Sequence, residues 1–188
     1  MNTLTSIRHA GAITVVVATL LAGCGRETPE VLIVSAKEYL AKNDNKAAEI
    51  QLKNALQKSP NLAEGRFLLG TALLKNGDVV SAEKELRKAL ELNYPVEEVV
   101  PPLARSLVGL GQHQNLINEF GKTQITVPER RAELQTAIGQ AQLALGNVSA
   151  ATRAFADARA AQPTYVPAHL GEARILASSS LNANGLMR

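Results

Sequence analysis

Apolar residues recur along this chain with the spacing of an amphipathic helix. In the stretch from Ala47 to Asn61, small and large apolar residues follow one another at steps of four and three positions. Positions four and seven apart lie on one face of a helix, so the stretch predicts a helix with a single apolar stripe. The stretch from Ser81 to Tyr94 repeats the pattern after about 34 residues. We therefore expect helices that cover each other's stripes.

The interval persists along most of the chain and defines repeats at 29–62, 63–96, 97–131 and 132–165, with a partial repeat at 166–177. An interval of this length predicts an all-α array in which each unit packs only against its neighbours. A helical bundle without repeats is the alternative. The structural repeat positions are Ala48, Leu52, Ala55, Gly70, Ala82, Leu86, Ala89, Gly139, Ala151, Phe155 and Ala158.

These positions resemble the tetratricopeptide repeat (TPR) pattern over about residues 29 to 176. The third copy is the weakest, because Leu116 and Thr123 stand where the pattern has small residues. The resemblance implies an all-α, TPR-like right-handed solenoid of antiparallel helix pairs.

Several local signals refine the helix boundaries. Gly77 is suited to a positive φ in the turn of the second repeat, and Asp78 can cap the helix that follows. Pro101 and Pro102 fall inside a predicted helix, which either begins one turn late or has a distorted first turn. After residue 177 the pattern ends, and we expect an irregular tail at 178–188.

The start of the chain has the pattern of an export signal. A basic residue, Arg8, precedes an apolar run that is too short for a comfortable membrane span, so residues 1–23 are predicted to be a signal peptide. The four residues Leu-Ala-Gly-Cys that end at Cys24 resemble the bacterial lipobox. The resemblance implies lipidation of Cys24, with residues 24–28 as a short tether. A plain signal peptide with a chance cysteine is the alternative.

The lipid anchor would hold the chain at the bacterial cell envelope. The residue after Cys24 is Gly25 and not the aspartate that commonly retains lipoproteins at the inner membrane. This favours the periplasmic face of the outer membrane. Cys24 is also the only cysteine, so a disulfide within the chain is excluded.

Composition and motifs predict neither an enzyme nor a nucleic-acid-binding protein. The chain has 188 residues and a formal net charge of +3, with acidic and basic residues interleaved and no basic run that would follow a phosphate backbone. Its three histidines lie far apart and lack metal-ligand spacing. Nucleophile and phosphate-loop motifs are also absent, so we predict no catalytic residues, no metal site and no cofactor.

The TPR resemblance implies a binding groove lined by the first helix of each repeat. The ninth position of successive repeats carries side chains that are mostly hydrogen-bond donors. Phe67 is the apolar candidate, at the fifth position, and the donors are Lys37, Thr71, Arg105, Gln140 and Arg174. Such donors suit an extended peptide or an acidic polysaccharide, although a solvated surface would have the same composition. For the glutamates at the second position, a structural role is the favoured interpretation, because an acid in the first turn of a helix complements its dipole.

A lipobox followed at once by TPR units resembles the amino-terminal part of the TPR lipoproteins of exosortase/PEP-CTERM systems, the PrsT type. The resemblance implies a membrane-anchored scaffold for other envelope proteins, associated with exopolysaccharide production and PEP-CTERM protein sorting. A direct polysaccharide-binding or export-assisting module is the alternative. The last helix lacks a partner helix, which indicates a fragment of a longer array, a frameshifted tail, capping by another molecule, or a helix that caps the array by itself.

Overall fold

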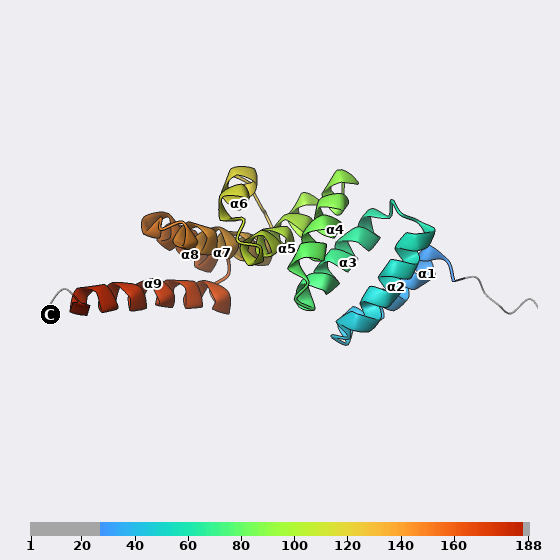
Figure 1. Ribbon diagram of the computed structural model, residues 1–188, viewed down its shortest axis with the longest axis horizontal. Coiled ribbons are helices and arrows are strands. Elements are labelled where there is room, and N and C mark those ends of the chain that lie inside the picture. Colours follow the sequence, from blue (N-terminus) through green and yellow to red (C-terminus); the bar gives the residue numbers. More distant parts are fainter. Residues whose placement is uncertain (1–26, 186–188) are drawn as a thin grey trace, which may run out of the picture.

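The computed structural model describes residues 27–185, and these residues form an elongated array of α-helices (Figure 1). The predicted signal peptide and Cys24 lie outside the described residues. No strand occurs within 27–185, which confirms the predicted all-α class. The helices are α1 (Pro29–Ala41), α2 (Asn45–Lys58), α3 (Ala63–Lys75), α4 (Val79–Glu91), α5 (Val96–Gly109), α6 (His113–Phe120), α7 (Pro128–Ala144), α8 (Val148–Ala161) and α9 (Val166–Gly185).

Consecutive helices pack as hairpins that follow one another along the long axis of the molecule, from α1 at one end to α9 at the other (Figure 1). The closest pairs are α1 with α2, α3 with α4 and α7 with α8. Each pair also contacts the next, so the architecture is a TPR-like helical solenoid. Helix α9 packs against α7 and α8.

The apolar stripe of each even-numbered helix is buried between neighbouring odd-numbered helices. Its small and large members are fully buried, with no exposed side-chain surface at Ala48, Leu52, Ala55, Ala82, Leu86, Ala89, Ala151, Phe155 and Ala158. Alanine allows two helix backbones to approach closely, and the leucine or phenylalanine between two alanines fills the remaining space.

Two glycines show how close these approaches are. A Cβ atom placed on Gly70 would lie 2.6 Å from Cγ of Leu86, and one placed on Gly139 would lie 2.7 Å from the ring of Phe155. Both distances are shorter than a van der Waals contact, so the large side chain of the second helix occupies the space beside the glycine of the first. The same contact recurs in the second and fourth repeats.

The turn inside each repeat also recurs in the same backbone conformation. Gly77, Gly111 and Gly146 have positive φ angles of 87°, 70° and 80°, and Asn43 takes the equivalent place with φ 58°. Asn is among the few other residues that tolerate this region. In the first two repeats the residue after the turn caps the next helix: the carboxylates of Asp44 and Asp78 accept hydrogen bonds from the N–H groups of Ala47 and Ser81, both at 3.0 Å. The predicted turn and cap are both present.

Helix α5 does not begin late, although it contains two prolines. It begins at Val96 and includes the buried Pro101 and Pro102. Proline has no N–H, so the carbonyls of Glu97 and Glu98, which lie in the first turn of α5, lack their usual helical partners. A side chain of the first turn also contacts the loop before α7: the carboxylate of Glu97 accepts hydrogen bonds from the N–H and the hydroxyl of Thr126, both at 2.7 Å.

The structure also differs from our expectation at the carboxyl-terminal end of the described residues. We predicted that residues 178–188 are irregular, whereas α9 continues to Gly185. The serines that suggested a helix end do not interrupt the helix, because the hydroxyls of Ser178 and Ser179 donate to the carbonyls of Ile175 and Leu176, both at 2.8 Å. No proline follows in the sequence to stop the helix before the glycine.

The contact between Gly139 and Phe155 predicts the effect of one added methyl group. Gly139→Ala should lower the free energy of unfolding, because overpacking costs about 1–3 kcal/mol and the gain in helix propensity recovers only about 1 kcal/mol. Chemical denaturation would measure the change. Adding Phe155→Leu to this variant should restore part of the loss, since leucine lacks the ring edge that faces the methyl group. Independent, additive effects of the two substitutions would contradict the contact.

Candidate functional site

The odd-numbered helices α1, α3, α5, α7 and α9 form the surface that carries the predicted groove residues. We call this the odd-helix surface. Neighbouring members contact one another at α3 with α5, α5 with α7 and α7 with α9. Side chains at the same position of successive repeats therefore lie in a row along the array.

Two cations at the ninth position form ion pairs with acids of the following repeat. Lys37 of α1 forms an ion pair with Glu64 of α3 at 2.7 Å, and Arg105 of α5 forms one with Glu133 of α7 at 3.2 Å. Both acids occupy the second position of their repeats. The hydrogen bond from Lys37 to Glu64 raises the pKa of the lysine. These two cations are therefore neutralised within the chain.

Glu98, the acid at the second position of the third repeat, has a different partner. Its carboxylate pairs with Arg130 of α7 at 2.5 Å. The ninth position of the preceding repeat is Thr71, whose hydroxyl donates to the carbonyl of Phe67 in the same helix at 2.9 Å. Acids at the second position thus connect neighbouring repeats, in addition to lying in first turns where they complement the helix dipole.

Phe67 lies beneath this part of the surface and is almost completely buried. Its ring stacks on the ring of Tyr94, with centroids 4.7 Å apart. Burial raises the pKa of the Tyr94 phenol, and the carboxylates of Glu64 and Glu98 act in the same direction. Phe67 is therefore a packing residue that supports Tyr94, which the sequence analysis did not select.

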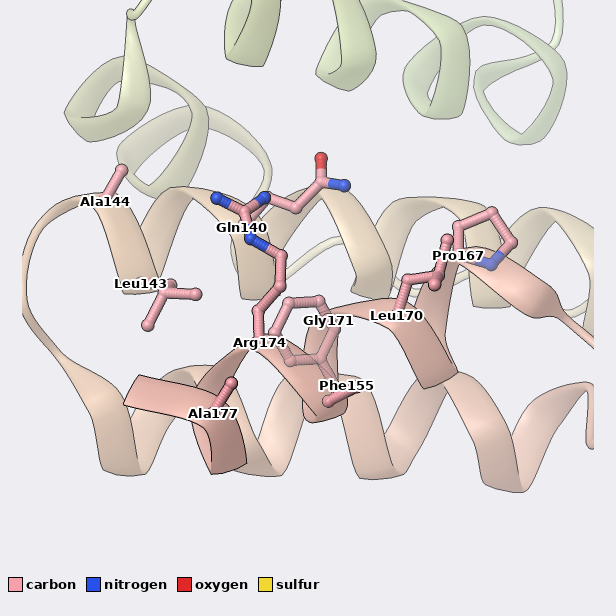
Figure 2. A pocket seen from close by; sticks show the side chains of 10 residues that line it. Gln140, Leu143, Ala144, Phe155, Pro167, Leu170, Gly171, Arg174 and Ala177 are labelled. Carbon is pink, nitrogen blue, oxygen red and sulfur yellow. The ribbon is translucent and has the colours of Figure 1, made fainter. Parts of the chain in front are cut away.

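A pocket of about 630 Å³ opens between α7 and α9 (Figure 2). Most of its lining is apolar, with the buried ring of Phe155 at its base. Gln140 and Arg174 are the only polar side chains that line it. The lining residues are Gln140, Leu143, Ala144, Phe155, Pro167, Leu170, Gly171, Ala173, Arg174 and Ala177.

The side chains of Gln140 and Arg174 make no hydrogen bond or ion pair with the described part of the chain, in contrast to Lys37 and Arg105. Arg174 extends from α9 towards α7 and lies beside Gln140 in Figure 2. Of the five ninth-position residues, these two are brought together at an apolar pocket. The pocket is thus a part of the odd-helix surface where polar groups beside apolar ones are available to a ligand.

The base of the pocket is tightly packed. Cβ atoms placed on Gly139 of α7 and Gly171 of α9 would both lie within 3.0 Å of the Phe155 ring. The ring is therefore held between the two helices that form the walls. The sequence pattern places Phe155 in the core, but it does not show that the pocket lies above it, because the separation of α7 and α9 is a property of the packed array.

Within residues 27–185, no three His, Cys, Asp or Glu side chains gather in a way that could hold a metal ion. No helix of the same region is long and apolar enough to cross a bilayer. The arrangement offers apolar surface and hydrogen-bond donors, which is the chemistry of binding.

Comparison with known families supports the TPR assignment. A family model described as tetratricopeptide repeat matches residues 39–99, from the second half of α1 to the first turn of α5. The match supports the tetratricopeptide repeat family, and it does not support the exosortase-associated lipoprotein type. A search of curated proteins gave no match. TPR folds are typically non-catalytic scaffolds that bind other proteins.

The stacked pair on the odd-helix surface predicts a pH dependence. Because the folded state favours the neutral phenol of Tyr94, its stabilising effect is complete below the ordinary pKa of 10.0 and is lost as the pH rises through the raised folded pKa. In a variant with Tyr39→Phe and Tyr165→Phe, phenolate absorbance should show a midpoint above 10.0 in the folded protein. The same variant in denaturant is the control. A folded midpoint at or below the denatured one would contradict the burial of Tyr94.

Proposed function

We propose that this chain is a membrane-anchored scaffold of the bacterial envelope, held by a lipid on Cys24 and binding other proteins through the odd-helix surface. The observation that carries the binding role is the pocket between α7 and α9, where Gln140 and Arg174 have no partner within the described residues. The fold supports the same role, since a TPR-like array offers a long surface of parallel helices.

The anchor is supported by sequence. The lipobox ends at Cys24, and the first helix begins at Pro29, so only a few residues separate the lipid from the array. Several acyl chains hold a protein firmly on a bilayer, because each buried methylene contributes about 0.8 kcal/mol. Gly25 favours the periplasmic face of the outer membrane over the inner membrane.

The likeness to TPR lipoproteins of exosortase/PEP-CTERM systems extends the proposal to a pathway. The scaffold would recruit envelope proteins that take part in exopolysaccharide production and in PEP-CTERM protein sorting. Its support is the combination of lipobox and TPR units in one chain.

Direct binding of an acidic polysaccharide is the second candidate, and the geometry favours it less. A long polyanion is best held by a row of free cations. Lys37 and Arg105, which would belong to such a row, are already paired with Glu64 and Glu133.

The anchor predicts the mass of the mature protein. After expression in a Gram-negative host, mass spectrometry of the first peptide should show an acylated Cys24 as the new amino terminus. Cys24→Ser should release the protein from the membrane fraction, while circular dichroism shows unchanged helix content. An unmodified Cys24, or a signal peptide cut elsewhere, would contradict the anchor.

The scaffold role predicts where partners make contact. With a photo-crosslinking amino acid in place of Leu170, beside the pocket, irradiation of intact cells should attach the protein covalently to other envelope proteins. The same substitution at Arg153, an exposed residue of α8 that does not line the pocket, is the control. Equal protein adducts at both positions, or adducts with polysaccharide alone, would contradict the proposed surface.

A further inference from the structure

We call the contact region between two successive odd-numbered helices an interval. The interval between α7 and α9 lacks the acid that two earlier intervals contain. Between α1 and α3, Glu64 faces Lys37, and between α5 and α7, Glu133 faces Arg105. The corresponding second position of the last repeat is Pro167. In two intervals a cation at the ninth position of one repeat thus meets an acid at the second position of the next. Between α7 and α9 both members of this pair are absent, because Gln140 stands at the ninth position and Pro167 at the second.

The pocket at this interval nevertheless carries an unbalanced positive charge, which comes from α9. None of the ten residues that line the pocket is acidic, whereas Arg174 contributes a guanidinium. The nearby acid Glu172 on the same helix pairs with Arg159 of α8 at 3.3 Å. Arg174 is exposed, so its guanidinium is accessible to a ligand, and a hydrogen bond from a guanidinium to a carboxylate is stronger than one between neutral groups.

The rest of the pocket is suited to an apolar side chain next to that carboxylate. Leu170 of α9, which is 60% exposed, and Leu143 of α7 both line it. The volume of about 630 Å³ is within the range of specific ligand sites, roughly 300–1,000 Å³.

The length of the pocket favours a peptide over a small molecule. Its α9 wall extends from Pro167 to Ala177, which at 1.5 Å per residue corresponds to about 15 Å. An extended chain rises about 3.3 Å per residue, so about five residues of peptide would cover the wall. Gln140 can bond a peptide carbonyl or N–H along this path, because its amide both donates and accepts.

We propose that the pocket between α7 and α9 binds a partner's peptide segment in which apolar side chains alternate with glutamate or aspartate. The carboxylate pairs with the guanidinium of Arg174, which lines the pocket, and an apolar side chain packs above Phe155. This inference depends on the proposed scaffold function and specifies the chemistry of its partner.

The test is fluorescence polarisation with the full-length chain in detergent micelles. The probe is a labelled, end-blocked peptide Gly-Leu-Glu-Leu-Glu-Leu-Gly, and its analogue has glutamine in place of glutamate. The acidic probe should bind, and Arg174→Gln should weaken it about 10- to 100-fold, the effect of losing a hydrogen bond to a charged group. Arg153→Gln, which removes an exposed arginine outside the pocket, should leave binding unchanged. The glutamine analogue should bind the wild-type chain as weakly as the acidic probe binds the Arg174→Gln variant.

A second pair of variants tests whether an internal acid can take the ligand's place. Leu170→Glu puts a carboxylate four residues before Arg174 on the same helix, a spacing that favours an ion pair. It should block the acidic probe. Leu170→Gln removes the same apolar side chain without adding charge and should weaken binding less. Because Leu170 is exposed, both variants should retain the wild-type helix content and thermal midpoint.

The outcomes separate this inference from the scaffold function. If the acidic probe binds equally well to wild type and to Arg174→Gln, or no better than its glutamine analogue, the pocket inference is wrong while peptide binding by the array stands. If no peptide binds but alginate or octanoate does, the peptide-binding scaffold and the pocket inference are both wrong.

Discussion

The structure depends on one recurring contact, in which a large side chain of one helix fills the space beside a small residue of its partner. Leu86 against Gly70 and Phe155 against Gly139 are two examples, each too close to admit even one methyl group. The contact fixes the distance between the helices of a pair, and it repeats because the sequence repeats. Each repeat buries its stripe against its neighbours, so the array is stabilised mainly by nearest-neighbour packing.

The residues at two repeat positions determine the chemistry of the odd-helix surface. Where a cation stands at the ninth position and an acid at the second position of the next repeat, the two form an ion pair, which contributes roughly 0.2–1 kcal/mol when exposed. Such pairs connect neighbouring repeats and leave little free charge. At the last interval Gln140 and Pro167 replace the cation and the acid of this pair, and the side chains of Gln140 and Arg174 line a pocket and remain available. The proposed binding site is therefore an interval that the chain does not complete with its own side chains.

Much of the fold could be predicted from the sequence, because an apolar stripe repeated at a fixed interval permits few arrangements. The helix hairpins, the left-handed turn at Gly77 and the cap at Asp78 follow from local patterns. The continuation of α9 to Gly185 was not predicted, since serine favours helix ends in general but here bonds to the preceding turn. Of the two alternatives for Pro101 and Pro102, a late helix start is wrong, because α5 begins at Val96 and contains both prolines.

The candidate site was less predictable. The sequence contained a signal for the pairing of Lys37 with Glu64, namely an acid at the second position one repeat after the cation, but its meaning required knowing that first helices lie side by side. The pocket depends on the separation of α7 and α9, which no local pattern encodes.

Amide hydrogen exchange, followed by mass spectrometry on the full-length protein, tests the central claim most directly. If the contact between small and large residues holds each pair together, α7 and α8 should open with the same free energy in wild type, and Gly139→Ala should lower the protection of both by the same amount. Exchange of α8 that is unaffected by the substitution, or that is independent of α7 in wild type, would contradict the account.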